Sequence, residues 1–231
     1  MAIIISNSNL LLDPSARQHV ALLYENTQEL NEAIAVYINE GLRRGQLCVY
    51  ATVHYRDEGH IEHFLTLIED GKENVEKGNL LIIDLALLYI ASIVGDLTPF
   101  DDAKRLFVEN VRNRADRHIR FVGDGTGFLF KNKHFDECAM VEEWWQNKPF
   151  EGSYFCPFQK QYFNAYPDSL PLKRAVISTH DVVVNASELN RRKDNTDHDG
   201  HHQALASAII KEQSDIKENP VDKFDHGGET N

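Results

Sequence analysis

The sequence contains few cysteines, and their placement excludes a disulfide-rich protein. Cys48, Cys138 and Cys156 are odd in number and lie far apart in a chain of 231 residues. Small secreted domains that depend on disulfides carry closely spaced cysteines, usually in even number. We therefore expect free thiols and a cytoplasmic location.

Long hydrophobic runs are also missing. The longest apolar stretch, residues 80–94, contains Asp84 and is shorter than the ~20 residues that cross a bilayer. The short apolar run near the N-terminus has no basic residues before it, unlike a signal peptide. The sequence predicts neither a membrane span nor a secretion signal.

Basic residues are too few for a protein that binds polyanions. The 24 Lys and Arg are outnumbered by 36 Asp and Glu, so the formal net charge is -12. A nucleic-acid backbone or an anionic membrane surface attracts clustered basic side chains. We therefore expect no direct binding to nucleic acid or membrane.

The segment that would form a phosphate-binding loop lacks glycine and lysine. In such a loop, backbone N–H groups of glycines surround the phosphates, while Lys and Ser or Thr contribute charge and bind magnesium. Here the first predicted strand, residues 19–24, is followed by Glu25-Asn26-Thr27-Gln28. A carboxylate would lie where the phosphates bind. The sequence predicts a degenerate loop and no ATP hydrolysis, although residues 80–85 (LLIIDL) resemble a strand that ends in a magnesium-binding Asp.

What the chain does contain is an alternation of short apolar runs and helical segments. Such alternation predicts an α/β fold with a mostly parallel sheet and helices on both faces, which is a three-layer arrangement. We expect strands at 19–24, 47–53, 80–85, 119–123, 152–158 and 175–178, with 182–184 continuing the last one. We expect helices at 27–41, 59–70, 101–115 and 136–146.

The composition changes near residue 187. From there the chain is polar and charged, and its last fifteen residues contain almost nothing that could be buried. Such segments do not bury enough apolar surface to fold. We expect one α/β domain over residues 1–186 and a flexible, His-containing tail over 187–231.

Several motifs resemble the MEDS family, a sensory domain of methanogens and methylotrophs found in archaea and bacteria. The first block covers residues 19–53, and the resemblance as a whole covers roughly residues 15–186. The motifs that carry it are His19, Tyr24-Glu25, Glu40-Gly41-Leu42, Gly45-Gln46, Cys48-Val49-Tyr50, Cys156-Pro157-Phe158-Gln159 and Thr179-His180. Pro157, Phe158 and Gln159 depart from the pattern of the family, in which a Tyr-Asp pair is usual.

The resemblance implies a fold like that of RecA and KaiC. It also implies a role in signal transduction, proposed for the recognition of small carbon compounds. Relatives often carry a kinase or a DNA-binding module. None is present in this chain, so its signal would pass through a partner protein or through self-association, and a homodimer is expected by analogy with RecA-like proteins.

Ligands of open α/β sheets bind beyond the carboxyl ends of the strands. We therefore predict a ligand site from the residues that follow the predicted strands. Gly123-Asp124-Gly125-Thr126-Gly127 is either a flexible turn or a loop at the rim of this site. The predicted ligand-binding residues are Tyr24, Glu25, His54, Asp84, Asp124, Cys156, Phe158 and His180.

Three of the candidate side chains have alternative interpretations. Cys156 lies in an apolar strand, where a cysteine acts either as a small buried hydrophobe or as a nucleophile. His180 either binds a ligand or faces water. His19 begins its strand, at the opposite edge of the sheet from the predicted ligand site, so we expect a structural role for it.

No histidines or cysteines have the spacing typical of a metal site. His60 and His63 lie on one face of a predicted helix, which is also a common surface arrangement. His198, His201 and His202 lie in the tail, where adventitious binding is the simplest interpretation. We therefore predict no metal ion and no cofactor.

Three functions remain as hypotheses. The first is a sensor that binds a small ligand and signals to a partner protein without turnover. The second is an enzyme in which Cys156 pairs with His180 or an acid, since such pairing activates a thiol. The third is a scaffold for KaiC-like ATPases or histidine kinases.

Overall fold

The computed structural model describes residues 3–4, 12–111, 118–147, 152–165, 176 and 178–187. They belong to one compact unit, residues 1–193, and a second unit comprises residues 194–231. The expected flexible tail, apart from Ser187, therefore lies outside the described residues.

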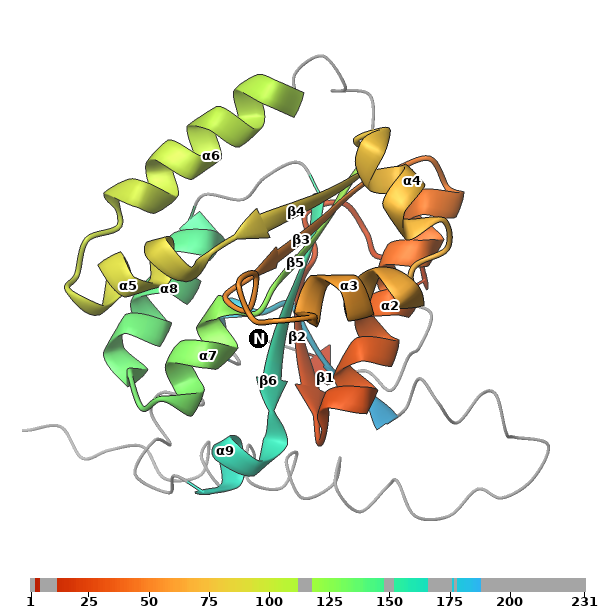
Figure 1. The fold of residues 1–231 in the computed structure, drawn as a ribbon. Coiled ribbons are helices and arrows are strands. Elements are labelled where there is room, and N and C mark those ends of the chain that lie inside the picture. Colours follow the sequence, from red (N-terminus) through yellow and green to blue (C-terminus); the bar gives the residue numbers. More distant parts are fainter. Residues whose placement is uncertain are drawn as a thin grey trace, which may run out of the picture. The chain divides into compact units, whose positions relative to one another are not determined.

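A seven-stranded parallel sheet forms the centre of the described domain (Figure 1). The strand order is β1-β7-β2-β6-β5-β3-β4, and each neighbouring pair is parallel. The strands are β1 (Ile3–Ile4), β2 (His19–Tyr24), β3 (Leu47–Thr52), β4 (Leu80–Asp84), β5 (Ile119–Gly123), β6 (Gly152–Gln159) and β7 (Val182–Asn185).

Helices cover both faces of this sheet. The helices are α2 (Thr27–Arg43), α3 (His60–Leu67), α4 (Gly71–Glu76), α5 (Ala86–Ile93), α6 (Thr98–Val111), α7 (Gly125–Lys131), α8 (Phe135–Asn147) and α9 (Lys160–Ala165). One apolar cluster packs α2 and α3 on one face, and a second packs α5, α7 and α8 on the other (Figure 1). The expected three-layer α/β fold is therefore confirmed.

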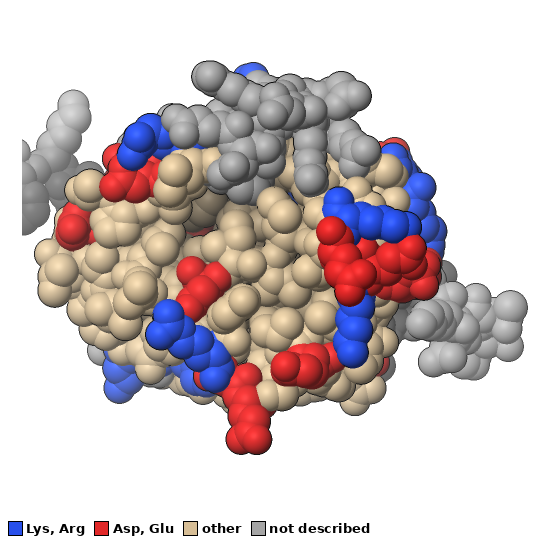
Figure 2. Space-filling model, turned by 45° about the horizontal axis from the view of Figure 1, so that its top comes forward, with Lys and Arg blue, Asp and Glu red and all other residues tan. Residues whose placement is uncertain are grey.

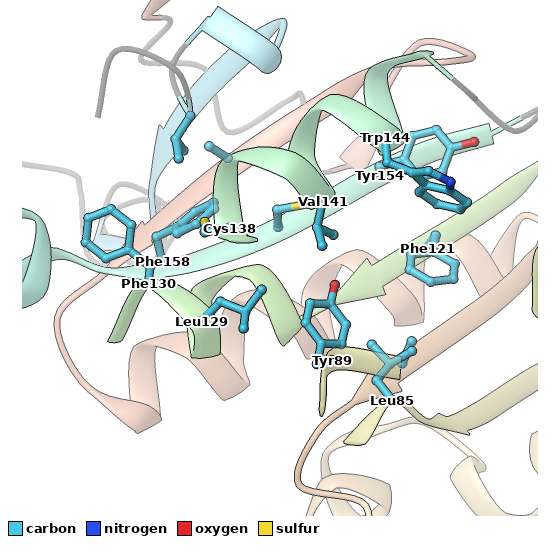
Figure 3. Packing of buried hydrophobic residues seen from close by; sticks show 14 of the residues in the cluster. Leu85, Tyr89, Phe121, Leu129, Phe130, Cys138, Val141, Trp144, Tyr154 and Phe158 are labelled. Atoms are coloured by element: carbon cyan, nitrogen blue, oxygen red, sulfur yellow. The ribbon is translucent and has the colours of Figure 1, made fainter. Parts of the chain in front are cut away.

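Side-chain alternation along the strands decides which residues belong to which layer. On β2, Leu22 faces α2, whereas Ala21 faces the layer that contains α7 and α8. On β6, Phe155 faces α2, whereas Cys156 and Phe158 face the opposite layer. This period of two is the ordinary geometry of a strand buried on both faces. Figure 3 shows Cys138, Val141 and Phe158 in the layer beneath α8.

The expected strand at 175–178 is wrong. Val176, Ser178 and Thr179 are helical, and the strand begins only at Val182. The Thr179 hydroxyl donates a hydrogen bond to the Val176 carbonyl oxygen at 2.9 Å, which stabilises a turn at this point. An apolar run therefore fits a short helical turn here, with Val176 buried on one side.

The glycine-rich segment, residues 123–127, joins β5 to α7, as expected of a strand-to-helix turn. It forms the end of β5 and the first turn of α7, with Gly125 and Thr126 buried. A Cβ at Gly125 would lie 2.0 Å from the Tyr89 ring, and one at Gly127 would lie 2.1 Å from the Pro157 carbonyl oxygen. The glycines are therefore required by the close approach of α7 to α5 and β6.

Candidate functional site

The turn after β2 is occupied by its own side chains. Asn26 Oδ1 accepts a hydrogen bond from the Glu29 backbone N–H at 3.0 Å, and Glu29 Oε2 accepts one from the Glu25 backbone N–H at 2.9 Å. Asn26 therefore caps α2, and the Glu29 carboxylate reaches back to the residue that precedes the cap. Lys160 Nζ lies 3.1 Å from Glu25 Oε1, and this ion pair connects the turn to α9.

Asp124 holds the loops at the carboxyl ends of β3 and β5 together. Its carboxylate accepts hydrogen bonds from the Thr52 hydroxyl at 2.6 Å and from the Val53 backbone N–H at 2.9 Å. Burial raises the pKa of the Asp124 carboxyl, while these bonds oppose that shift. Burial, with a smaller contribution from Asp124, raises the pKa of Tyr24 to about 12. Tyr24 and Asp124 are therefore electrostatically coupled at this edge.

Asp84 and His54 also lie at the carboxyl edge. Asp84 Oδ2 accepts a hydrogen bond from Arg56 Nε at 2.8 Å, and Asp84 Oδ1 accepts one from the Ala86 backbone N–H. His54 Nδ1 lies 2.7 Å from Asp57 Oδ2. The structure thus brings five of the eight predicted ligand-binding residues to this edge: Tyr24, Glu25, His54, Asp84 and Asp124.

The other three predicted residues lie elsewhere. Cys156, Phe158 and His180 are buried on the sheet face covered by α7 and α8, with exposed fractions of 7%, 0% and 2%. His180 precedes β7, so it lies at the amino end of that strand rather than beyond a carboxyl end. These three side chains are therefore packed within the protein, although Phe158 is the penultimate residue of β6 and lies near its carboxyl end.

Cys156 and His180 instead join His19 and Glu142 in a buried cluster of four potential metal ligands. One ligand atom from each residue lies within 4.8 Å of all the others. His19 Nε2 is 3.2 Å from Cys156 Sγ and 3.5 Å from Glu142 Oε2, and His180 Nε2 is also 3.5 Å from Glu142 Oε2. The two imidazole rings stack with centroids 3.9 Å apart. We call these four residues the His/Cys/Glu cluster.

Backbone carbonyl groups orient both imidazoles. His19 Nδ1 donates to the Thr179 carbonyl oxygen at 2.9 Å, and His180 Nδ1 donates to the Val176 carbonyl oxygen at 2.6 Å. Because Nδ1 carries the proton in each neutral ring, both Nε2 atoms present lone pairs to the cluster. The turn at 176–180, which replaces the expected strand, therefore directs both lone pairs inward.

Burial favours the neutral forms of these groups when no cation is bound. Desolvation lowers the pKa of His19 and of His180 to about 4. Desolvation raises the pKa of Glu142, and it also raises that of the Cys156 thiol. Within the described part of the chain, both Glu142 carboxylate oxygens and His180 Nε2 make no hydrogen bond of ordinary geometry, although the Thr126 hydroxyl is near enough to Glu142 to oppose the rise of its pKa. In these neutral forms the Glu142 carboxyl and the Cys156 thiol each keep a proton, and the two Nε2 atoms are acceptors.

Glu142 and His19 are the residues that the sequence did not point to. Glu142 is fully buried on α8. It lies one helical turn after Cys138 and directly after Val141, which are also buried. A carboxylate at an apolar helical position was the available signal, because acidic residues are seldom buried without a partner. His19 was expected to play only a structural role, and the fold places it between Cys156 and Glu142.

A comparison with family models gives one match. The model of the MEDS family, described as the methanogen/methylotroph DcmR sensory domain, matches residues 18–181. No curated protein matches the chain. The matched range includes the whole His/Cys/Glu cluster and most of the sheet. Because this model matches more than half of the chain, the chain belongs to the MEDS family of sensory domains.

Proposed function

We propose that the protein is a sensor that binds a small ligand and signals to a partner protein without hydrolysing ATP. The observation that carries this proposal is the occupied turn after β2. The N–H groups of Glu29 and Glu25 are bonded to the side chains of Asn26 and Glu29, and Glu25 adds a second carboxylate. Phosphate bound there would displace these contacts and face negative charge, whereas phosphate-binding loops offer free N–H groups and a lysine.

The topology of the sheet supports a ligand site at the carboxyl edge. From β3 the chain runs outward to β4, whereas from β5 it runs back toward β6, and β3 and β5 are neighbours. Such a reversal between adjacent strands is where open α/β sheets bind ligands. Thr52 and Asp124 occupy this position. In our proposal the chain keeps the sheet of a RecA- or KaiC-like protein and uses its ligand edge for another compound.

A shallow hollow of about 380 Å³ lies in the segment that follows β3. Its lining includes Tyr55, Arg56 and Gly59, and Arg56 also binds Asp84 at the end of β4. The hollow is open to solvent, and its lining comes from residues 55–62 alone. Because Arg56 joins it to Asp84 at the carboxyl edge, we propose that the ligand of the sensor binds beside Arg56, His54 and Asp84, where Asp124 holds the loop after β3 through the Val53 N–H.

The experiment is a thermal-shift and calorimetric comparison on the full chain. Small carbon compounds should include one that raises the melting temperature, since a ligand that binds only the folded state stabilises it. Mg-ATP should leave the melting temperature unchanged and release no phosphate. The variant Arg56→Ala should lose the shift, and Arg105→Ala, which removes an exposed arginine on α6 bonded to Asp102, should keep it.

Two outcomes would contradict the proposal. Stabilisation by Mg-ATP with measurable phosphate release would restore the ATPase interpretation. A ligand whose effect survives Arg56→Ala would place the site away from the carboxyl edge of β3 and β4.

A thiol enzyme is favoured by one contact only, the 3.2 Å separation of Cys156 Sγ and His19 Nε2. The structure pairs Cys156 with His19 rather than His180. Both groups are buried beneath α8, and burial raises the pKa of the thiol, whereas a catalytic cysteine needs a thiolate that substrate can reach. We therefore do not assign catalysis to Cys156.

The surface and the cysteines support the remaining parts of the proposal. On the face shown in Figure 2, Lys and Arg lie beside Asp and Glu rather than in a basic patch, which favours a protein partner over nucleic acid. No described helix has the length and apolarity needed to cross a bilayer. All three cysteines are buried and free, as expected in a reducing cytoplasm. Signalling through a homodimer remains part of the proposal.

A further inference from the structure

We propose that His19, Glu142, Cys156 and His180 bind a single divalent transition-metal ion, of the class represented by zinc. This site is independent of the ligand site proposed at the carboxyl edge. His19 is the first residue of β2 and Cys156 lies in the middle of β6, both on the face covered by α8, and no residue is shared between the two sites.

The distances in the cluster match a four-coordinate centre. A metal ion bonded at about 2.0–2.3 Å to four ligands in a tetrahedron separates those ligands by about 3.3–3.8 Å. The three measured ligand–ligand distances are 3.2, 3.5 and 3.5 Å. The remaining pairs lie within 4.8 Å, so small side-chain movements would close the tetrahedron.

The orientation of the imidazoles is a second, independent observation. A metal-bound histidine typically donates its other ring N–H to a carbonyl or carboxylate, which fixes its tautomer. Both His19 and His180 do this, to the carbonyl groups of Thr179 and Val176. His19 is held further by its backbone, whose N–H donates to Asp181 Oδ2 at 2.9 Å.

The unpartnered atoms indicate what the cluster lacks. His180 Nε2 and both oxygens of Glu142 are buried without a hydrogen bond in the described structure, and burying such groups unpaired is costly. Each is an electron-pair donor that points toward the others. A cation at their centre accepts an electron pair from all of them at once, whereas a water molecule donates only two hydrogen bonds.

The donor set selects the class of ion. Two imidazole nitrogens, one sulfur and one carboxylate oxygen favour borderline and soft ions such as Zn²⁺, Co²⁺ and Ni²⁺ over Mg²⁺ and Ca²⁺, which prefer oxygen. On binding, the Cys156 thiol and the Glu142 carboxyl each release a proton to solvent. The two negative charges then balance the ion, and the buried site becomes neutral overall.

The ion would join four separate parts of the fold. His19 comes from β2, Cys156 from β6, His180 from the segment before β7, and Glu142 from α8. Binding would therefore attach α8 to the sheet, so that the packing of α8 depends on the metal. This dependence gives the proposal a readout in stability as well as in binding.

The experiment is a titration of the metal-free full chain with Co²⁺ under reducing conditions. The tail histidines are first changed to His198→Gln, His201→Gln and His202→Gln, so that they do not compete. We expect one Co²⁺ per chain, with a sulfur-to-cobalt charge-transfer band and the intense visible bands of a four-coordinate ion. Excess Zn²⁺ should abolish these bands and raise the melting temperature, and a chelator should reverse that rise.

Single variants test the ligands. Cys156→Ser should remove the charge-transfer band, and His180→Ala should weaken Co²⁺ binding by roughly a hundredfold or more. The matched controls are Cys48→Ala, a buried thiol in the other apolar cluster, and His63→Ala, an exposed histidine. Both controls should bind Co²⁺ like the parent protein, and circular dichroism should show that all variants are folded.

The proposal is overturned if the folded parent chain binds no Co²⁺ or Zn²⁺, which would mean that the cluster holds protons only. It is also overturned if the charge-transfer band survives Cys156→Ser. Because the Co²⁺ spectrum does not depend on the ligand at the carboxyl edge, failure of the sensor proposal would leave this result unaffected.

Discussion

Arg120 is the largest fully buried side chain of the described domain, and its guanidinium group links three segments. It donates hydrogen bonds to the backbone carbonyl oxygens of Leu12 and Tyr37 at 2.7 and 3.0 Å, and to Gln46 Oε1 at 2.6 Å. The guanidinium also lies 5.0 Å from the centre of the Tyr37 ring. One residue on β5 therefore fixes α2 and the segment that precedes β2.

The variant Arg120→Met tests this role. We expect a loss of about 2–4 kcal/mol in the free energy of unfolding, because buried carbonyl groups lose their donors. Urea denaturation followed by circular dichroism measures the change. Arg43→Met is the control, since Arg43 pairs with Glu40 and Glu69 on the surface and its loss should leave the midpoint almost unchanged. Equal midpoints for the two variants would show that Arg120 contributes no more than a surface arginine.

The reactivity of Cys156 distinguishes a buried ligand from a catalytic nucleophile. In the presence of a chelator at neutral pH, we expect iodoacetamide to modify Cys156 at least about tenfold more slowly in the folded than in the denatured protein. Its rate in the folded protein should resemble that of Cys48, which is also buried with a raised pKa. Mass spectrometry of the digested protein gives both rates. Rapid and selective modification of Cys156 would instead support the thiol-enzyme hypothesis.

At the scale of elements, α7 illustrates how closely helix and sheet approach each other. Gly127 on α7 faces the Pro157 carbonyl oxygen on β6. The space between them is too small for a side chain. Gly127→Ala should lower the free energy of unfolding by about 1–3 kcal/mol, because the new methyl group must push α7 away from the strand. Lys131→Ala, on the exposed end of the same helix, is the control and should change stability little. Denaturant titration of both variants tests this, and an unchanged Gly127→Ala protein would contradict the close approach.

Helix α8 combines packing and chemistry on one face. Cys138, Val141 and Trp144 pack against the sheet, and Trp144 Nε1 donates to Asp101 on α6. Glu142 belongs to the same buried side, so the apolar packing of α8 brings its carboxylate to the two histidines. The helix was expected from its periodicity, whereas the role of Glu142 depends on what α8 covers.

At the scale of the whole molecule, the net charge of -12 disfavours partners that are polyanions. We expect a dissociation constant weaker than about 10⁻⁴ M for duplex DNA at physiological salt, because too few cations are available to replace condensed counterions. Fluorescence anisotropy with a labelled duplex measures it, with a basic DNA-binding protein as the positive control. Tighter binding that weakens steeply with added salt would contradict this expectation. It would show that the protein has a basic surface despite its negative net charge.

The sequence by itself determined the fold class and the order of the main elements. Apolar runs of period two and faces of period three to four are local patterns, and they placed β2 to β6 and the main helices near their observed bounds. It also determined that the turn after β2 lacks the glycines and the lysine of a phosphate-binding motif, because that motif is contiguous. The prediction of a strand at 175–178 was wrong because a short apolar run also fits a buried helical turn.

Only the tertiary structure decided the His/Cys/Glu cluster. His19 and Cys156 are separated by 137 positions, and no spacing rule relates residues that lie on two strands, a helix and a turn. Their proximity depends on the strand order and on the register that sets Ala21 opposite Cys156. It also depends on the packing of α8 over β2 and β6. Local periodicity specifies which face a side chain takes, whereas the long-range pairing of strands specifies which side chains share it.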